Sequence, residues 1–106
     1  MSNISVDEMF EMIADQSDKK HWNKNINWLF RKLQNEVNEV DIAIQKRDSP
    51  DHIAEEIVDV LYLLAQIKFE YCTQVNLTNA FMNKYELNAI TKKKTFDEQL
   101  QKVVER

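Results

Sequence analysis

Two acidic steps carry the strongest chemical signal in the sequence. The first is Glu36-x-x-Glu39, and the second is Glu56-x-x-Asp59. Each step stands in a stretch that otherwise has the apolar pattern of a helix. Three residues are nearly one helical turn, so each step places two carboxylates on one helical face. Four carboxylates brought together repel one another unless a cation lies among them. The pattern therefore predicts a cation site.

Asp59 is the most informative member of these steps. It interrupts the apolar run of residues 57–65, where Leu or Ala would pack better and where Asp is a poor helix former. The nearest basic residue along the same stretch is Lys68. Glu39 and Glu55 alone would fit an ordinary solvated helix face. Because Asp59 costs stability without a local cation, we expect it to have a compensating role.

The donor atoms indicate which cation to expect. Carboxylate oxygens favour hard ions, and a site that leaves positions for water and phosphate oxygens suits Mg²⁺ better than Ca²⁺. Zinc is not expected, because His21 and His52 lack the spacing of a zinc pair and Cys72 is the single cysteine. Magnesium at such a site neutralises a polyphosphate and lowers the pKa of an attacking water. The expected chemistry is therefore displacement at phosphorus.

The elements that position these carboxylates should all be helices. The chain has 106 residues, no Gly and one Pro, and 43% of its residues are hydrophobic. This length and composition fit one domain with a packed core. The lack of Gly disfavours β-hairpins and Gly-rich phosphate loops. We therefore expect a single all-α domain over residues 1–106, built as a four-helix bundle with a short C-terminal helix.

Caps and apolar periodicity predict where these helices begin and end. Ser5-x-x-Glu8 and Thr95-x-x-Glu98 are capping boxes, and Ser49-Pro50-Asp51 is the clearest helix start. Asn76 or Thr78 caps a further helix. The predicted helices cover about residues 5–16, 25–46, 50–74 and 76–91, with a short one from residue 95.

The connection at residues 48–51 is short, so the two long helices should be antiparallel neighbours. Glu36 precedes it by twelve residues and Asp59 follows Pro50 by nine, which places the two acidic steps at comparable heights. The segment 57–65 is apolar nearly all round, and one small chain has little material to cover it. We therefore expect self-association to complete the bundle.

Composition disfavours several other classes of protein. A net charge of -4, with Lys92–Lys94 as the only basic run, argues against a nucleic-acid partner. The single Cys72 allows no intrachain disulfide and favours a reducing compartment. Residues 1–7 lack a secretory pattern, and the longest apolar run is too short to cross a membrane. We expect a cytoplasmic protein with no nucleic-acid or membrane partner.

The segments Leu33–Val40 and Ala54–Leu61 resemble the ExxE and ExxD core of the MazG-like all-α nucleoside triphosphate pyrophosphohydrolases. The similarity includes the hairpin between the steps and spans most of Leu29–Gln66. It implies cleavage of a nucleoside triphosphate, expected to be a deoxynucleotide, to the monophosphate and pyrophosphate in nucleotide-pool house-cleaning. It also implies a homodimer or a homotetramer. The Mg²⁺ ligands that it implies are Glu36, Glu39, Glu56 and Asp59.

A second element of the same family is also present in outline. Lys84-x-x-x-Asn88 resembles its K-x-x-x-N element, which implies that the lysine meets phosphates and the asparagine meets the sugar or a phosphate. A spacing of four places both side chains on one helical face. Family members often carry Gly or a further acidic residue near the first step, where this chain has asparagines. The candidate for positioning the attacking water is therefore either Glu39 or Glu55.

Aromatic residues near the start of the second predicted helix are candidates for binding a base. Trp22 offers a surface on which a base can stack, an interaction worth roughly 1–3 kcal/mol. Trp28, at helical spacing with Leu29–Phe30, is interpreted as part of the core. Lys32 stands one turn before Glu36 and should either pair with that carboxylate or contact a phosphate.

Two alternatives to this function stay open. The chain is small and lacks Gly, which favours a non-catalytic helical oligomerisation module with a degenerate acidic site. A phosphoribosyl-ATP pyrophosphohydrolase also resembles the chain in its helical acidic core. Incubation with Mg²⁺ and a panel of triphosphates separates an active enzyme from an inactive module.

Overall fold

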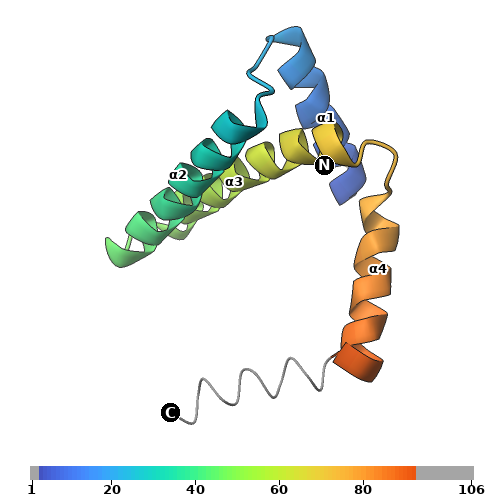
Figure 1. The fold of residues 1–106 in the computed structure, drawn as a ribbon. Helices are drawn as coiled ribbons and strands as arrows, with labels where there is room; N and C mark the ends of the chain where they lie inside the picture. Colours follow the sequence, from blue (N-terminus) through green and yellow to red (C-terminus); the bar gives the residue numbers. More distant parts are fainter. Residues whose placement is uncertain (1–2, 93–106) are drawn as a thin grey trace. The chain divides into compact units, whose positions relative to one another are not determined.

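The computed structural model describes residues 3–92, and every regular element among them is helical. The predicted all-α class is therefore confirmed. The second capping box, Thr95-x-x-Glu98, and the short helix expected after it lie outside the described residues. No helix within residues 3–92 is long and apolar enough to cross a membrane. The elements are α1 (Val6–Lys19), α2 (Ile26–Gln45), α3 (Pro50–Tyr71), α4 (Leu77–Leu87) and a π-helical turn, η1 (Asn88–Lys92) (Figure 1).

The described helices fall into two compact units. The first contains α1, α2 and α3, and the second contains α4 and η1. In the second unit, α4 has no buried residue, and its Phe81 and Tyr85 rings lie 6.0 Å apart. The single domain over residues 1–106 stays a prediction.

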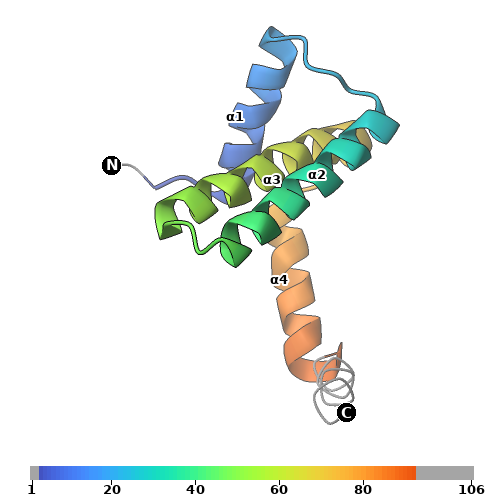
Figure 2. The same cartoon turned by 90° about the vertical axis from the view of Figure 1, so that its left-hand side faces the viewer.

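Helix α3 is the centre of the first unit. It runs antiparallel to α2 after the short connection, as predicted, and α1 packs across it (Figures 1 and 2). Because α3 contacts both neighbours, its sequence needs apolar residues on more than one face. The buried apolar core consists of Phe10, Ile13, Leu29, Ala43, Leu63 and Ala65.

Polar side chains begin each helix where the caps predict. Ser5 Oγ accepts from the Glu8 N–H at 3.1 Å. The Ser5 N–H donates to Glu8 Oε1 at 3.1 Å, which completes the capping box. Ser49 accepts from the His52 N–H at the start of α3. Asn76, one of the two candidates, caps α4. These bonds satisfy backbone donors that have no partner inside the helix.

Helices α1 and α2 are each followed by a residue in the left-handed backbone conformation, although the chain has no Gly. His21 has φ 55° and Arg47 has φ 57°. The Asp48 N–H donates to the Ala43 carbonyl and the Arg47 N–H donates to the Ile44 carbonyl, both at 3.0 Å. This pair of bonds is a Schellman motif, whose left-handed position usually holds Gly. A side chain with a Cβ costs stability there.

Arg47→Gly should therefore stabilise the protein. The substitution removes the steric cost of the left-handed conformation, and we expect a gain of about 0.5 to 1 kcal/mol in the free energy of unfolding. Urea denaturation measures it. Lys46→Gly is the matched control, because Lys46 has φ -79° and should lose stability when replaced. A loss with Arg47→Gly would contradict the assigned cost.

Three predicted helix ends differ from the structure. Helix α4 ends at Leu87, four residues before its predicted end, and the π-helical turn η1 follows it. Helix α1 continues to Lys19, three residues beyond its predicted end. Helix α3 stops at Tyr71 instead of about Gln74, because Cys72 leaves the helical region with φ -146° and ψ 50°. The buried Lys68 stabilises this end of the helix by donating from Nζ to the Thr73 carbonyl at 3.0 Å.

Candidate metal and nucleotide site

The α2–α3 hairpin brings three of the predicted carboxylates together. Helix α2 contributes Glu36, and α3 contributes Glu56 and Asp59. One oxygen from each lies within 4.8 Å of the others. Glu36 and Glu56 are half-buried, whereas Asp59 is exposed in the single chain. Three of the four carboxylates in the two acidic steps therefore lie close together, as the hairpin predicted.

The other two acidic candidates lie outside this group. Glu39 and Glu55 are exposed, and neither belongs to the set of three oxygens. Glu55 is close enough to act on Asp59, because its charge helps to raise the pKa of that carboxyl. The role of Glu39 as a ligand, and of either residue in positioning water, stays a prediction.

A lysine and a histidine border the cluster. Lys32 Nζ lies 3.1 Å from Glu36 Oε1, which is the pairing predicted from their spacing. His52 Nε2 lies 3.4 Å from Glu56 Oε1 and 3.6 Å from Asp48 Oδ2. Sequence reasoning considered His52 only as a zinc ligand and missed this position. Its spacing of four residues from both carboxylates is the signal that would have found it.

Desolvation and neighbouring charges shift the pKa of Asp59. Partial desolvation raises the pKa of its carboxyl above the ordinary value, and the charges of Glu36 and Glu55 raise it further. Lys32 opposes these effects from the neighbouring helix. The sequence neighbours of Asp59 along α3 include no close cation. Lys32 lies on α2 and acts on Asp59 across the hairpin, so the sequence of α3 alone does not indicate it. Desolvation and the two carboxylates outweigh Lys32, so added positive charge would favour the ionised form of Asp59.

Lys32→Met should raise the pKa of Asp59 further. The substitution removes a favourable charge that lowers the pKa of this carboxyl. A ¹³C NMR titration of the Asp59 carboxyl measures the change. Arg31→Met is the control, because Arg31 is an exposed neighbour that does not line the pocket beside the cluster. An Asp59 pKa that does not move in Lys32→Met would contradict the assigned interaction.

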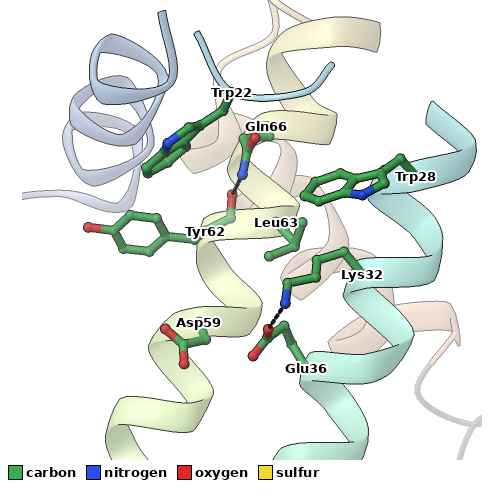
Figure 3. A pocket seen from close by; sticks show the side chains of 8 residues that line it. All are labelled: Trp22, Trp28, Lys32, Glu36, Asp59, Tyr62, Leu63 and Gln66. Carbon is green, nitrogen blue, oxygen red and sulfur yellow. Dashed lines mark hydrogen bonds and ion pairs between the residues drawn. The ribbon is translucent and has the colours of Figure 1, made fainter. Parts of the chain in front are cut away.

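Two members of the cluster, Glu36 and Asp59, lie at one end of a pocket of about 310 Å³ (Figure 3). On α2 the lining residues recur every four positions, and on α3 they recur every three or four, so each helix contributes one stripe. Because the helices are antiparallel, both stripes run from carboxylates at one end to larger side chains at the other. The lining residues are Trp22, Trp28, Lys32, Glu36, Asp59, Tyr62, Leu63 and Gln66.

Both tryptophans line this pocket. Trp22 is half-buried in the connection between α1 and α2, and its ring centroid lies 6.1 Å from that of Tyr62 at an interplanar angle of 47°. The interpretation of Trp28 as core is wrong, since its side chain is 38% exposed and forms a pocket wall. Leu29, which is 0% exposed, takes the core position instead. The pocket thus has an aromatic end opposite its carboxylates.

Gln66 is a pocket residue that sequence reasoning did not select as functional. It is 8% exposed, and its Nε2 donates to the Tyr62 carbonyl at 3.3 Å. Its Oε1 is buried and accepts no hydrogen bond from any residue between positions 3 and 92. The signal in the sequence was its spacing of seven residues from Asp59, which keeps both on one helical face.

The predicted substrate-binding pair Lys84 and Asn88 belongs to the second unit. Lys84 lies in the last turn of α4, and Asn88 caps its C-terminus, where η1 begins. Both side chains are exposed. Their contacts with phosphate or sugar stay a prediction.

The pocket combines two kinds of chemistry. Glu36 and Asp59, two of the three convergent carboxylates, line the pocket and suit a hard divalent cation, and an aromatic wall suits a planar ring. A ligand with a polyanionic end and a flat end would use both. No protein-family model, curated protein or solved structure matches this chain.

Proposed function

We propose that this chain is a Mg²⁺-dependent nucleoside triphosphate pyrophosphohydrolase that acts on a deoxynucleotide. The observation that supports the proposal most is the single pocket that joins the carboxylates of Glu36 and Asp59 to the rings of Trp22 and Trp28. The ligand it fits has phosphates at one end and a base at the other. The resemblance of the acidic steps to the MazG-like enzymes favours the same activity.

The acidic end of the pocket has the donor set that Mg²⁺ requires. Mg²⁺ binds oxygens at about 2.0–2.1 Å, so oxygens on opposite sides of the ion stand about 4 Å apart. The oxygens of Glu36, Glu56 and Asp59 lie within 4.8 Å of one another, so the three side chains would have to draw together to share one ion. The ion would supply charge neutralisation and polarisation at the phosphates. Glu39 is the proposed fourth ligand, and it or Glu55 would position the attacking water.

The dimensions of the pocket also suit a nucleotide. Asp59 and Gln66 are seven residues apart on α3, which corresponds to about 10 Å along the helix axis. Between these ends lies Lys32, whose side chain is 45% exposed and whose ammonium is paired with Glu36. We propose that Lys32 contacts a phosphate, that the base stacks on the tryptophans, and that Lys84 and Asn88 approach the phosphates and sugar.

Assembly into a homodimer or a dimer of dimers is part of the proposal. Several large apolar side chains of the α2–α3 hairpin remain exposed in the single chain, and their burial in a second copy would contribute stability. These side chains are Val37, Ile44, Ile57, Val58 and Leu64. Light scattering at low micromolar concentration measures the mass. We place the enzyme in the cytoplasm, where it would remove surplus or non-standard nucleotides.

Product analysis tests the proposed reaction directly. The protein is incubated with Mg²⁺ and each common nucleoside and deoxynucleoside triphosphate, and the products are separated by ion-exchange chromatography. Water adds across the α–β anhydride bond, so the expected products are the nucleoside monophosphate and pyrophosphate in equal amounts. Release of single phosphate would indicate a different reaction. The absence of products with every triphosphate, phosphoribosyl-ATP included, would favour the inactive oligomerisation module.

A further inference from the structure

The aromatic end of the pocket contains one polar group whose hydrogen bonding is incomplete. Gln66 is 8% exposed, and its Oε1 is buried without a donor among residues 3–92. Such an acceptor is less favourable than one that is hydrogen-bonded, because it has lost water without gaining a donor. A ligand that donates a hydrogen bond to it would recover that free energy.

The orientation of the Gln66 amide is set by its neighbour. Its Nε2 donates to the carbonyl oxygen of Tyr62 at 3.3 Å, and a carbonyl oxygen can only accept. Exchanging the amide nitrogen and oxygen would place two acceptors face to face. Oε1 is therefore held as an acceptor, and the amide cannot simply turn to suit a different ligand.

The position of Gln66 identifies which part of a ligand it meets. In Figure 3 its side chain lies between Trp22 and Trp28, at the opposite end of the pocket from Asp59 and Glu36. A nucleotide whose phosphates lie at the carboxylates places its base here. Oε1 is covered in the free chain, so a wall side chain must move to admit the base. Trp22 is the wall residue that belongs to a connection and not to a helix.

We propose that Gln66 is a specificity-determining residue whose Oε1 selects nucleobases with an amino group over those with a keto group at the same position. The inference rests on the proposed function for the orientation of the nucleotide. An amino group on the base edge donates to Oε1, whereas a keto oxygen there opposes a second acceptor and leaves both unsatisfied. The preferred substrates are thus triphosphates of amino-substituted bases.

Binding of monophosphates tests this selection without hydrolysis. dCMP and dUMP differ at one position, amino against keto, and dAMP and dIMP differ in the same way. We expect the wild type to bind the amino member of each pair roughly five- to tenfold more tightly by calorimetric titration. Gln66→Met should bring both ratios near one, mainly by weakening the amino member. Gln74→Met is the matched control, since Gln74 is exposed and outside the pocket.

The outcomes separate this inference from the proposed function. Equal binding of dCMP and dUMP by the wild type, or an unchanged ratio in Gln66→Met, would overturn the role of Gln66. Pyrophosphate release could still be observed in either case, and the proposed reaction would then stand alone. An amino preference that is lost in Gln66→Met, in a protein that hydrolyses no triphosphate, would support the selection and overturn the reaction. The wild-type comparison needs no variant, so it holds even where Gln66→Met does not fold.

Discussion

Asp59→Asn should abolish pyrophosphate release and make the folded chain more stable at neutral pH. The substitution keeps the size of the side chain and removes one charge from the group of three carboxylates. Loss of a group that only supports a metal ligand costs roughly 10- to 100-fold in metal affinity or activity. Loss of a ligand itself should cost more, so we expect at least about a 100-fold fall in kcat/KM.

The gain in stability follows from the raised pKa of Asp59. Desolvation and the charges of Glu36 and Glu55 raise the pKa above its ordinary value of 3.8, so the folded state favours the protonated carboxyl. At pH values between 3.8 and the raised pKa of Asp59, the folded state binds more protons than the unfolded state. The free energy of unfolding therefore falls as pH rises through this window. Asn cannot ionise, so the variant should lose this contribution to the pH dependence.

Pyrophosphate release measures the loss of activity, and thermal denaturation measures the change in stability and the loss of metal binding. Without divalent ions, Asp59→Asn should melt above the wild type at pH 7, and the difference should shrink as the pH falls below 3.8. Mg²⁺ should raise the melting temperature of the wild type and leave that of the variant unchanged, because a ligand stabilises only the state that binds it. Asp41→Asn, an exposed position on α2, is the control and should behave like the wild type. Full activity in Asp59→Asn would contradict the metal site.

The parts of the fold that were predictable from sequence depend on local interactions. Ser49 caps α3 through a bond to the N–H of His52, three residues away, so its effect can be recognised within one turn. The acidic steps are equally local, because a spacing of three fixes a helical face whatever surrounds it. The short connection then dictated an antiparallel hairpin, and the meeting of Glu36 with Glu56 and Asp59 followed from it.

The parts that were not predictable depend on contacts between helices. Lys32 acts on Asp59 from α2, a relation that cannot be found by searching along α3 alone. Trp28 and Leu29 are adjacent and both large and apolar, yet only Leu29 is buried, because the crossing of the helices decides which of the two faces inward. The step of four that relates Lys32 to Glu36, taken once more, would have placed Trp28 on the site face as well. The left-handed Arg47 gave no signal, since this position usually holds Gly.

Trp28→Ala should weaken substrate binding strongly while leaving the fold nearly intact. Trp28 forms a wall of the pocket and is 38% exposed, and the neighbouring Leu29 supplies the buried contact with the core. Stacking of a base on an aromatic ring is worth about 1–3 kcal/mol, which corresponds to roughly a 5- to 150-fold rise in KM. Stacking acts on the base and not on the reacting phosphates, so it stabilises the bound substrate and the transition state alike. We therefore expect kcat to change little.

Phe30→Ala is the matched control for this prediction. Phe30 is an aromatic residue two positions further along α2, is 50% exposed and lies outside the pocket. Its replacement should leave KM unchanged, although it should alter the oligomeric state if this face meets a second copy. Steady-state kinetics with the preferred triphosphate, together with light scattering, distinguishes the two variants. Equal KM values for Trp28→Ala and Phe30→Ala would contradict stacking on Trp28, whereas a fall in kcat alone would assign this ring to the reacting end of the nucleotide.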